Sequence, residues 1–132
     1  MTSAYTPHNN PENRARLLHL LKSRHTGQAQ SAKKSELLTE MWGADASADK
    51  SYNNQYDRSL RAMIEELVQD GEPICSSPTA GYWYAASLED GLPAAERAYS
   101  RATTQLHNAL RLKQNILETY GGQMSLLEAT NV

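Results

Sequence analysis

The 132-residue chain contains a single cysteine, Cys75, so it cannot form an internal disulfide. Cys75 lies in a predicted strand, a setting typical of a packed thiol rather than a nucleophile. No apolar run approaches the roughly 18 residues that cross a bilayer, and the first residues lack the charged-then-apolar order of a signal peptide. We therefore expect a cytoplasmic protein that does not enter a membrane.

The sequence also lacks the arrangements on which catalysis depends. It has no glycine-rich phosphate loop and no Ser, His and Asp set with the spacing of a triad. The adjacent Glu65 and Glu66 would diverge from one helix rather than converge on a substrate. The four histidines have no metal-ligand spacing, lying at His8, His19, His25 and His107. We expect no enzyme activity, no metal site and no cofactor.

Positive charge is scarce overall but unevenly distributed. The composition, 39% hydrophobic and 21% charged, is typical of one soluble globular domain, and the net charge of −2 does not advertise nucleic-acid binding. Up to Lys34, however, six basic residues face one acid, Glu12, whereas acids dominate from Glu36 to Glu72. Any DNA-binding surface must therefore be local, combining the basic first helix and its loop with the start of the third helix.

The most informative stretch runs from Ser51 to Ala85. Its apolar residues recur at helical spacing, which predicts a buried stripe of Leu60, Ile64, Leu67 and Val68. The cap of this third helix is Ser51, Asn53 or Asn54, and Asp70-Gly71 ends it. A β-hairpin follows, with a first strand from Ile74, turn residues from Ser76 to Gly81, and an aromatic return strand from Tyr82 to Ala85.

The segment DRSLRAMIEELVQDGEPICSSPTAGYWYA carries a resemblance to a known family. With the two helices before it, it resembles winged helix-turn-helix domains, such as the DNA-binding domain of the biotin-operon repressor, and small winged-helix proteins of bacteriophages. The resemblance covers residues 11–86 and implies a mainly α fold with a small β-hairpin wing. It also implies that this domain binds double-stranded DNA, with the third helix in the major groove.

Two helices precede this stretch, after an N-terminal tail, residues 1–10, that we expect to be disordered. Asn10 caps the first helix, Pro11 is its first residue, and His25-Thr26-Gly27 ends it. A second helix is predicted from about Ala32 to Trp42. The inward faces of the two helices are predicted to hold Leu17, Leu18, Leu21, Leu37, Leu38 and Met41. A flexible connector is predicted from Gly43 to Lys50.

The DNA-contacting residues are predicted from their chemistry and from their place on the third helix and the wing. Side-chain amides suit adenine, and the guanidinium fork of an arginine suits guanine or a phosphate. Arg61 has an alternative role as a surface partner of Glu65. The wing tip carries no positive charge, so only its hydroxyls and backbone are available to phosphates. The predicted DNA-binding residues are Lys33, Lys34, Asn53, Asn54, Gln55, Arg58, Ser59, Arg61, Ser77 and Thr79.

Residues 87–120 are predicted to form a connector and a long helix that begins at Pro93 and ends at Tyr120, before Gly121-Gly122. Seven-residue repeats along this helix predict self-association into a homodimer, with Lys113 interrupting one seam. The alternative is a helix that folds back over the winged domain. The predicted dimerisation residues are Ala95, Tyr99, Ala102, Leu106, Ala109 and Ile116.

The C-terminal tail, residues 121–132, contains a short motif formed by Gln123, Met124, Ser125, Leu126 and Leu127. It resembles the peptide by which bacterial replication and repair proteins dock on the DNA polymerase sliding clamp, with Leu127 in place of the commoner Phe. A segment after a Gly-Gly pair suits capture by a partner as a linear motif. The alternative is a terminus that frays or packs against a second subunit.

Together these features predict a dimeric winged-helix DNA-binding protein of the bacteriophage type, acting in DNA replication or its control and docking on the sliding clamp. One alternative is a dimeric transcription regulator whose tail has no function. A second alternative is a protein–protein adaptor in which the acidic region around the third helix binds protein, since fold alone does not decide function.

Overall fold

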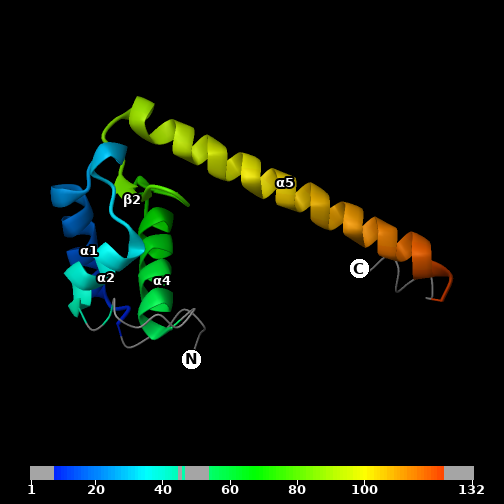
Figure 1. The fold of residues 1–132 in the computed structure, drawn as a ribbon, viewed down its shortest axis with the longest axis horizontal. Coiled ribbons are helices and arrows are strands. Elements are labelled where there is room, and N and C mark those ends of the chain that lie inside the picture. Colours follow the sequence, from blue (N-terminus) through cyan, green and yellow to red (C-terminus); the bar gives the residue numbers. More distant parts are fainter. Residues whose placement is uncertain (1–7, 45, 47–53, 124–132) are drawn as a thin grey trace. The chain divides into compact units, whose positions relative to one another are not determined.

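The helices α1 (Pro11–Arg24), α2 (Lys34–Trp42) and α4 (Gln55–Gln69) pack against one another (Figure 1). A hairpin of β1 (Ile74–Ser77) and β2 (Gly81–Tyr84) follows, and then the long helix α5 (Leu88–Tyr120). Short 3-10 turns, η1 (Gln28–Gln30) and η2 (Gly121–Gln123), complete the regular structure. The predicted mainly α fold, with a hairpin and a long C-terminal helix, is therefore confirmed, and it is compatible with a winged helix.

The computed structural model describes residues 8–44, 46 and 54–123. The chain divides into two units, Met1–Ala95 and Glu96–Val132, and we call the described residues of the first unit the head. Within the predicted connector, Ala44 and Ala46 are helical and Ala46 is buried, so these two positions are part of the packed head. The rest of that connector after Ala46 lies outside the described residues.

The beginnings of α1 and α2 follow from different interactions. Asn10 caps α1, as predicted, because its side chain accepts a hydrogen bond from the Asn13 backbone N–H (2.8 Å). The predicted start of α2 at Ala32 is wrong, because Ala32 exchanges two backbone hydrogen bonds with Tyr82 (both 2.8 Å). A residue held in this bridge cannot also begin a helix, so α2 starts at Lys34.

The core lies between the three short helices and the hairpin. Its fully buried side chains are Leu17, Leu21, Leu37, Leu60, Met63 and Trp83. The predicted inward positions Leu38 and Met41 are also buried, whereas Leu18 is only partly buried. The prediction for Val68 is wrong, since its side chain is 44% exposed. Val68 lies at the edge of the α4 stripe, and Met63, which the predicted stripe omitted, occupies the core instead.

β2 is paired along both of its edges. On one side it forms the antiparallel hairpin with β1, in a register that sets Cys75 opposite Trp83. On the other side Tyr84 accepts a hydrogen bond from the Gly27 N–H and donates one to the His25 carbonyl (both 2.8 Å), and Tyr82 pairs with Ala32. The segment between α1 and α2 therefore pairs with β2 on the edge opposite β1, in the position of a third strand.

His25 fixes this chain segment from the side. Its ring is buried, with Nδ1 2.9 Å from the Gln30 carbonyl oxygen and Nε2 2.8 Å from Glu40 Oε1. The contact joins the end of α1, the turn η1 and the middle of α2. His25, predicted only as a helix end, is thus an anchor of the loop that pairs with β2.

α5 begins at Leu88, before the predicted Pro93. Ser87 Oγ accepts a hydrogen bond from the Asp90 N–H (3.1 Å), and the Asp90 carboxylate accepts from the backbone N–H groups of Gln28 and Ala86 (both 3.0 Å) and from Trp83 Nε1 (3.1 Å). These hydrogen bonds hold the pKa of the Asp90 carboxyl below its ordinary value, and the one from the Gln28 N–H has the largest effect. Asp90 thus ties the first turn of α5 to the loop and the hairpin.

Cys75 faces this first turn of α5. Its Sγ lies 4.0 Å from the Gly91 carbonyl oxygen, and a Cβ added at Gly91 would lie only 2.8 Å from the Ala85 Cβ. Burial raises the pKa of the Cys75 thiol, and the charge of Asp90 raises it further. A protonated, half-buried thiol agrees with the predicted packing role of Cys75.

We predict that Gly81→Ala destabilises the head by about 3–4 kcal/mol. Gly81 has a φ of 95°, and a Cβ there would lie 2.2 Å from the Ala32 carbonyl oxygen, so the substitution adds backbone strain and breaks the Ala32–Tyr82 bridge. Gly71→Ala is the matched control, because Gly71 also has a positive φ but nothing lies within 4 Å of an added Cβ. It should cost only about 1–2 kcal/mol. Urea denaturation followed by circular dichroism measures both, and equal losses would contradict the steric explanation.

We predict that the stabilisation supplied by Asp90 depends on pH. Because its folded-state pKa is lowered, the carboxylate stabilises the fold above the ordinary aspartate pKa of about 3.9 and loses this effect as the pH falls through the folded value. Asp90→Asn should therefore lower the Tm at pH 7, and the difference from wild type should shrink towards about pH 3. A difference in Tm that stayed constant over this range would show that the charge of Asp90 is not what stabilises the fold.

Candidate nucleic-acid interface

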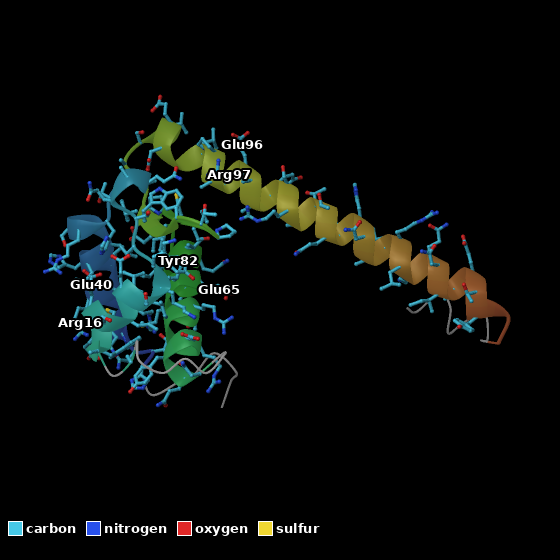
Figure 2. The ribbon with its side chains drawn as sticks, in the orientation of Figure 1. Arg16, Glu40, Glu65, Tyr82, Glu96 and Arg97 are labelled. Carbon is cyan, nitrogen blue, oxygen red and sulfur yellow. The ribbon has the colours of Figure 1, made fainter. Side chains whose placement is uncertain are left out.

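α4 presents one buried face and one exposed face. Asn54 is the cap, since its side chain accepts a hydrogen bond from the Asp57 backbone N–H (2.9 Å). The buried face holds Leu60, Met63, Ile64 and Leu67. The exposed face holds Gln55, Arg58, Arg61 and Glu65, and Glu65 points outward in Figure 2. Three of the predicted DNA-binding residues therefore share an exposed helix face.

The start of α2 meets the start of α4 through an ion pair. Lys34 Nζ lies 3.2 Å from Asp57 Oδ2, and the side chain of Lys34 is 51% exposed whereas that of Asp57 is only 7% exposed. The buried carboxylate therefore holds the ammonium group at the surface. The structure thus brings Lys34 to the same side of the head as the N-terminal turns of α4.

Tyr82, labelled in Figure 2, lies on β2 and is influenced by the charged groups at the starts of α2 and α4. Burial raises the pKa of its phenol, the positive charges of Arg61 and Lys34 lower it, and the Asp57 carboxylate raises it again. These three charged groups are therefore electrostatic neighbours of the phenol. Tyr82, predicted only to pack the hairpin, is therefore a further candidate for the site that the sequence pattern does not reveal.

Lys33 carries positive charge to the wing. Its Nζ donates a hydrogen bond to the Thr79 carbonyl oxygen (2.5 Å), across 46 positions of sequence. The wing turn itself contains no basic residue, so the cation at its tip comes from the residue that precedes α2. We call Lys33, Lys34, Arg58, Arg61, Thr79 and Tyr82 the candidate face.

Other predicted DNA-binding residues are used differently. The prediction for Ser59 is wrong, because its side chain is 0% exposed within the head and cannot reach a duplex. Ser77 Oγ accepts hydrogen bonds from the backbone N–H groups of Thr79 and Ala80 (both 3.2 Å), so its hydroxyl closes the wing turn. Asn54 uses its side-chain oxygen as the α4 cap, and Asn53 lies outside the described residues.

The basic residues of α1 contact other parts of the head. Arg14 pairs with Glu66 of α4 (3.0 Å), Arg24 pairs with Glu40 of α2 (3.2 Å), and Lys22 Nζ lies 5.5 Å above the ring of Tyr84. These contacts join α1 to α4, to α2 and to β2. These three side chains thus have contacts within the head, and the expectation that the basic first helix forms part of the DNA-binding surface stays a prediction.

The predicted dimerisation residues are all exposed, namely Ala95, Tyr99, Ala102, Leu106, Ala109 and Ile116. Their pairing with a second chain stays a prediction. Of the clamp-like motif, Gln123 ends the turn η2, and Met124, Ser125, Leu126 and Leu127 lie outside the described residues.

Two further findings concern other kinds of site. In the described ranges, no group of three or more His, Cys, Asp or Glu side chains is placed to hold a metal ion. None of the helices that the structure describes combines the length and the apolarity needed to cross a membrane.

The chain matches no protein-family model, and it has no significant match among curated proteins or solved structures. What the protein does must therefore be inferred from its own residues. The two features that bear most directly on function are the candidate face of the head and the exposed face of α5.

Proposed function

We propose that the protein is a winged-helix-type DNA-binding protein that acts in DNA replication or its control. The observation that carries the proposal is that the start of α2 contacts both α4 and the wing, since Lys34 pairs with Asp57 (3.2 Å) and Lys33 donates a hydrogen bond to the Thr79 carbonyl oxygen (2.5 Å). Ammonium, guanidinium and hydroxyl groups are the donors that contact phosphate oxygens in protein–DNA complexes. The exposed start of α4, between these donors, supplies the side chains for the groove.

In this proposal α4 enters the major groove and the flanking cations contact the backbone. Arg58 and Arg61 lie three positions apart, on one helix face, and each presents a planar fork that fits guanine or a phosphate. Lys33 and Lys34, at the start of α2, neutralise phosphates beside the helix and release counterions. The phenol of Tyr82, which is protonated at neutral pH, donates its O–H to a phosphate.

Acidic side chains limit the strength of this face. Asp57 offsets part of the charge of Lys34, and Glu36 and Glu65 are exposed on α2 and α4. We therefore expect modest affinity for DNA and a clear dependence of that affinity on salt.

The competing proposal is a protein–protein adaptor, and its supporting observation is an open depression on α2 lined by Ser35, Glu36, Thr39 and Glu40.

Docking on the sliding clamp is the part of the proposal that points to replication rather than transcription. It is supported by the sequence from Gln123 to Leu127 and by its position after Gly121-Gly122. A short peptide that fills a groove is recognised by a few anchor side chains, here Gln123 and the leucine pair. A transcription regulator with the same head would not need these anchors.

DNA binding is tested with a fluorophore-labelled generic duplex, titrated with the full chain at several salt concentrations and followed by anisotropy. The association constant should fall as salt rises, and the double variant Arg58→Ala/Arg61→Ala should bind at least about fivefold more weakly. Lys33→Ala should reduce the slope of log affinity against log salt by about 1, because one phosphate contact is lost.

Arg16→Ala is the matched control for this titration. Arg16 is exposed on α1 and lies on the other side of the head from Glu65 (Figure 2), so its loss should leave affinity almost unchanged. Equal weakening by Arg16→Ala would show that total charge, not the candidate face, drives binding. A folded wild-type chain that does not bind DNA at low salt would exclude the proposal and favour the adaptor.

Clamp docking is tested by a pull-down of the full chain with a bacterial polymerase sliding clamp. Gln123→Ala and Leu126→Ala should each abolish capture, since each removes an anchor of the peptide. Asn131→Ala, in the same tail but outside the motif, should be captured like wild type. Capture of all three variants at the wild-type level would remove the clamp from the proposal and leave DNA binding to be judged by the titration alone.

A further inference from the structure

The second unit of the chain exposes an apolar helix face. Between Glu96 and Tyr120, all of which the structure describes, α5 contains no buried residue. Tyr99 is 76% exposed and Leu106 is 57% exposed, and four more large apolar side chains on this segment are about half exposed, namely Leu110, Leu112, Ile116 and Tyr120. Exposed apolar area of this extent on one helix is typical of an interaction surface.

Tyr99, Leu106, Leu110 and Tyr120 follow the spacing of a coiled-coil seam, whereas Ile116 borders it and Leu112 lies outside it. Steps of four and three residues lead along one face of α5 through Glu96, Tyr99, Thr103, Leu106, Leu110, Lys113, Leu117 and Tyr120. This seam includes Leu110 and Leu117, which the predicted dimerisation set omitted, and Thr103, Lys113 and Leu117 are the half-buried positions of the segment. The alanines Ala102 and Ala109 lie along one side of the seam.

Two opposite charges interrupt the seam, Glu96 near one end and Lys113 towards the other. The positions that border the seam are uncharged, namely Ser100, Ala102, His107, Ala109, Gln114 and Ile116. The arginines of this segment fall outside the seam and its borders, at Arg97, Arg101 and Arg111. Because border charges often set the orientation of paired helices, their absence here leaves that choice to Glu96 and Lys113.

We propose that α5 pairs with α5 of a second copy of the chain in antiparallel orientation, with Glu96 of each copy opposite Lys113 of the other. A parallel, in-register pair would instead set Lys113 against Lys113 and Glu96 against Glu96, and like charges at such positions are strongly unfavourable. Reversing one helix turns both repulsions into attractions. Charge complementarity therefore selects a reversed copy of the same helix as the partner.

The register fixed by these charges also aligns the apolar positions. It centres the pair between Thr104 and Gln105, so that Tyr99 faces the partner's Leu110 and Thr103 faces the partner's Leu106. Moving the register by one heptad would place Lys113 opposite the uncharged Thr103 or opposite Glu89, which lies in the first turn of α5 and belongs to the head. The charged pairs and the apolar pairs therefore agree on a single register.

The alanines fit this arrangement as well. In an antiparallel pair, equivalent borders of the two helices face each other, which brings Ala102 close to the partner's Ala109. Small side chains on one border allow the two helices to approach closely, and the other border carries only Ser100 and His107 near the centre. Self-association through α5 does not depend on DNA binding by the head, so the two proposals can fail separately.

The first experiment measures the dimer dissociation constant of the full chain by sedimentation equilibrium. Glu96→Lys and Lys113→Glu should each weaken the dimer by at least about tenfold, because each creates two like-charge pairs. The double variant Glu96→Lys/Lys113→Glu should recover wild-type affinity. In a parallel dimer neither single variant adds a like-charge pair, so singles that associate like wild type would overturn the proposal, as would a wild-type monomer at high concentration.

Arg101→Glu is the matched control for the charge reversals. Arg101 is exposed on α5 but lies off the seam, so its reversal should not change the dissociation constant. Circular dichroism of every variant reports whether the helix content is retained. Equal weakening by Arg101→Glu would show a general charge effect and would contradict the Glu96–Lys113 pair.

The second experiment identifies orientation by disulfide formation in a Cys75→Ser background, which removes the native thiol. Tyr99→Cys and Leu110→Cys chains are mixed and oxidised, and the antiparallel register predicts a mixed disulfide between them. In the antiparallel register, the cysteines at position 99 of two Tyr99→Cys chains lie about 16 Å apart along the helix axis. This distance is well beyond the reach of a disulfide. Homodisulfides of Tyr99→Cys would show a parallel pair and would overturn the proposal.

Discussion

The head depends on the pairing of β2 along both of its edges. One edge joins β1, and the other joins the chain on either side of η1, so the hairpin is attached to α1 and α2 as well as to α4. The close approach of the Ala32 carbonyl requires glycine at position 81. The same pairing buries Trp83, joins Tyr82 to Ala32, and ends next to Lys33. The backbone pairing of β2, and not the side chains of the candidate face, therefore brings that face together.

Elements that neighbouring residues determine could be predicted from the sequence. Asn10 with Pro11 begins α1, Asp70-Gly71 ends α4, and the turn chemistry before Gly81 gives the hairpin. Each of these signals works within a few residues, through a cap, a positive φ or a fixed φ. Ser87 and Asp90, a serine followed by an acid three positions on, are also a local signal for the start of α5. Proline at the first position of a helix is a second such signal, and the prediction used Pro93.

Features that distant residues determine could not be predicted in this way. α2 begins after Ala32 because Tyr82 holds that residue, Lys33 reaches the wing through Thr79, and Ser59 is buried although its helix position placed it beside the exposed face. In each case the deciding partner lies elsewhere in the chain, where no local periodicity records it. The candidate face was consequently predicted only in part, with Tyr82 missing and Ser59 wrongly included.

The two units of the chain obtain their order from different sources. The head encloses its own core, and its stability is therefore a property of each molecule. From Glu96 to Tyr120 α5 has no core of its own, so a pairing of helices would stabilise it by mass action. The order of this segment then varies with the concentration of the protein, and dilution would expose its backbone to proteases while the head remained folded. Abundance in the cell would become a variable to which one half of the molecule responds and the other does not.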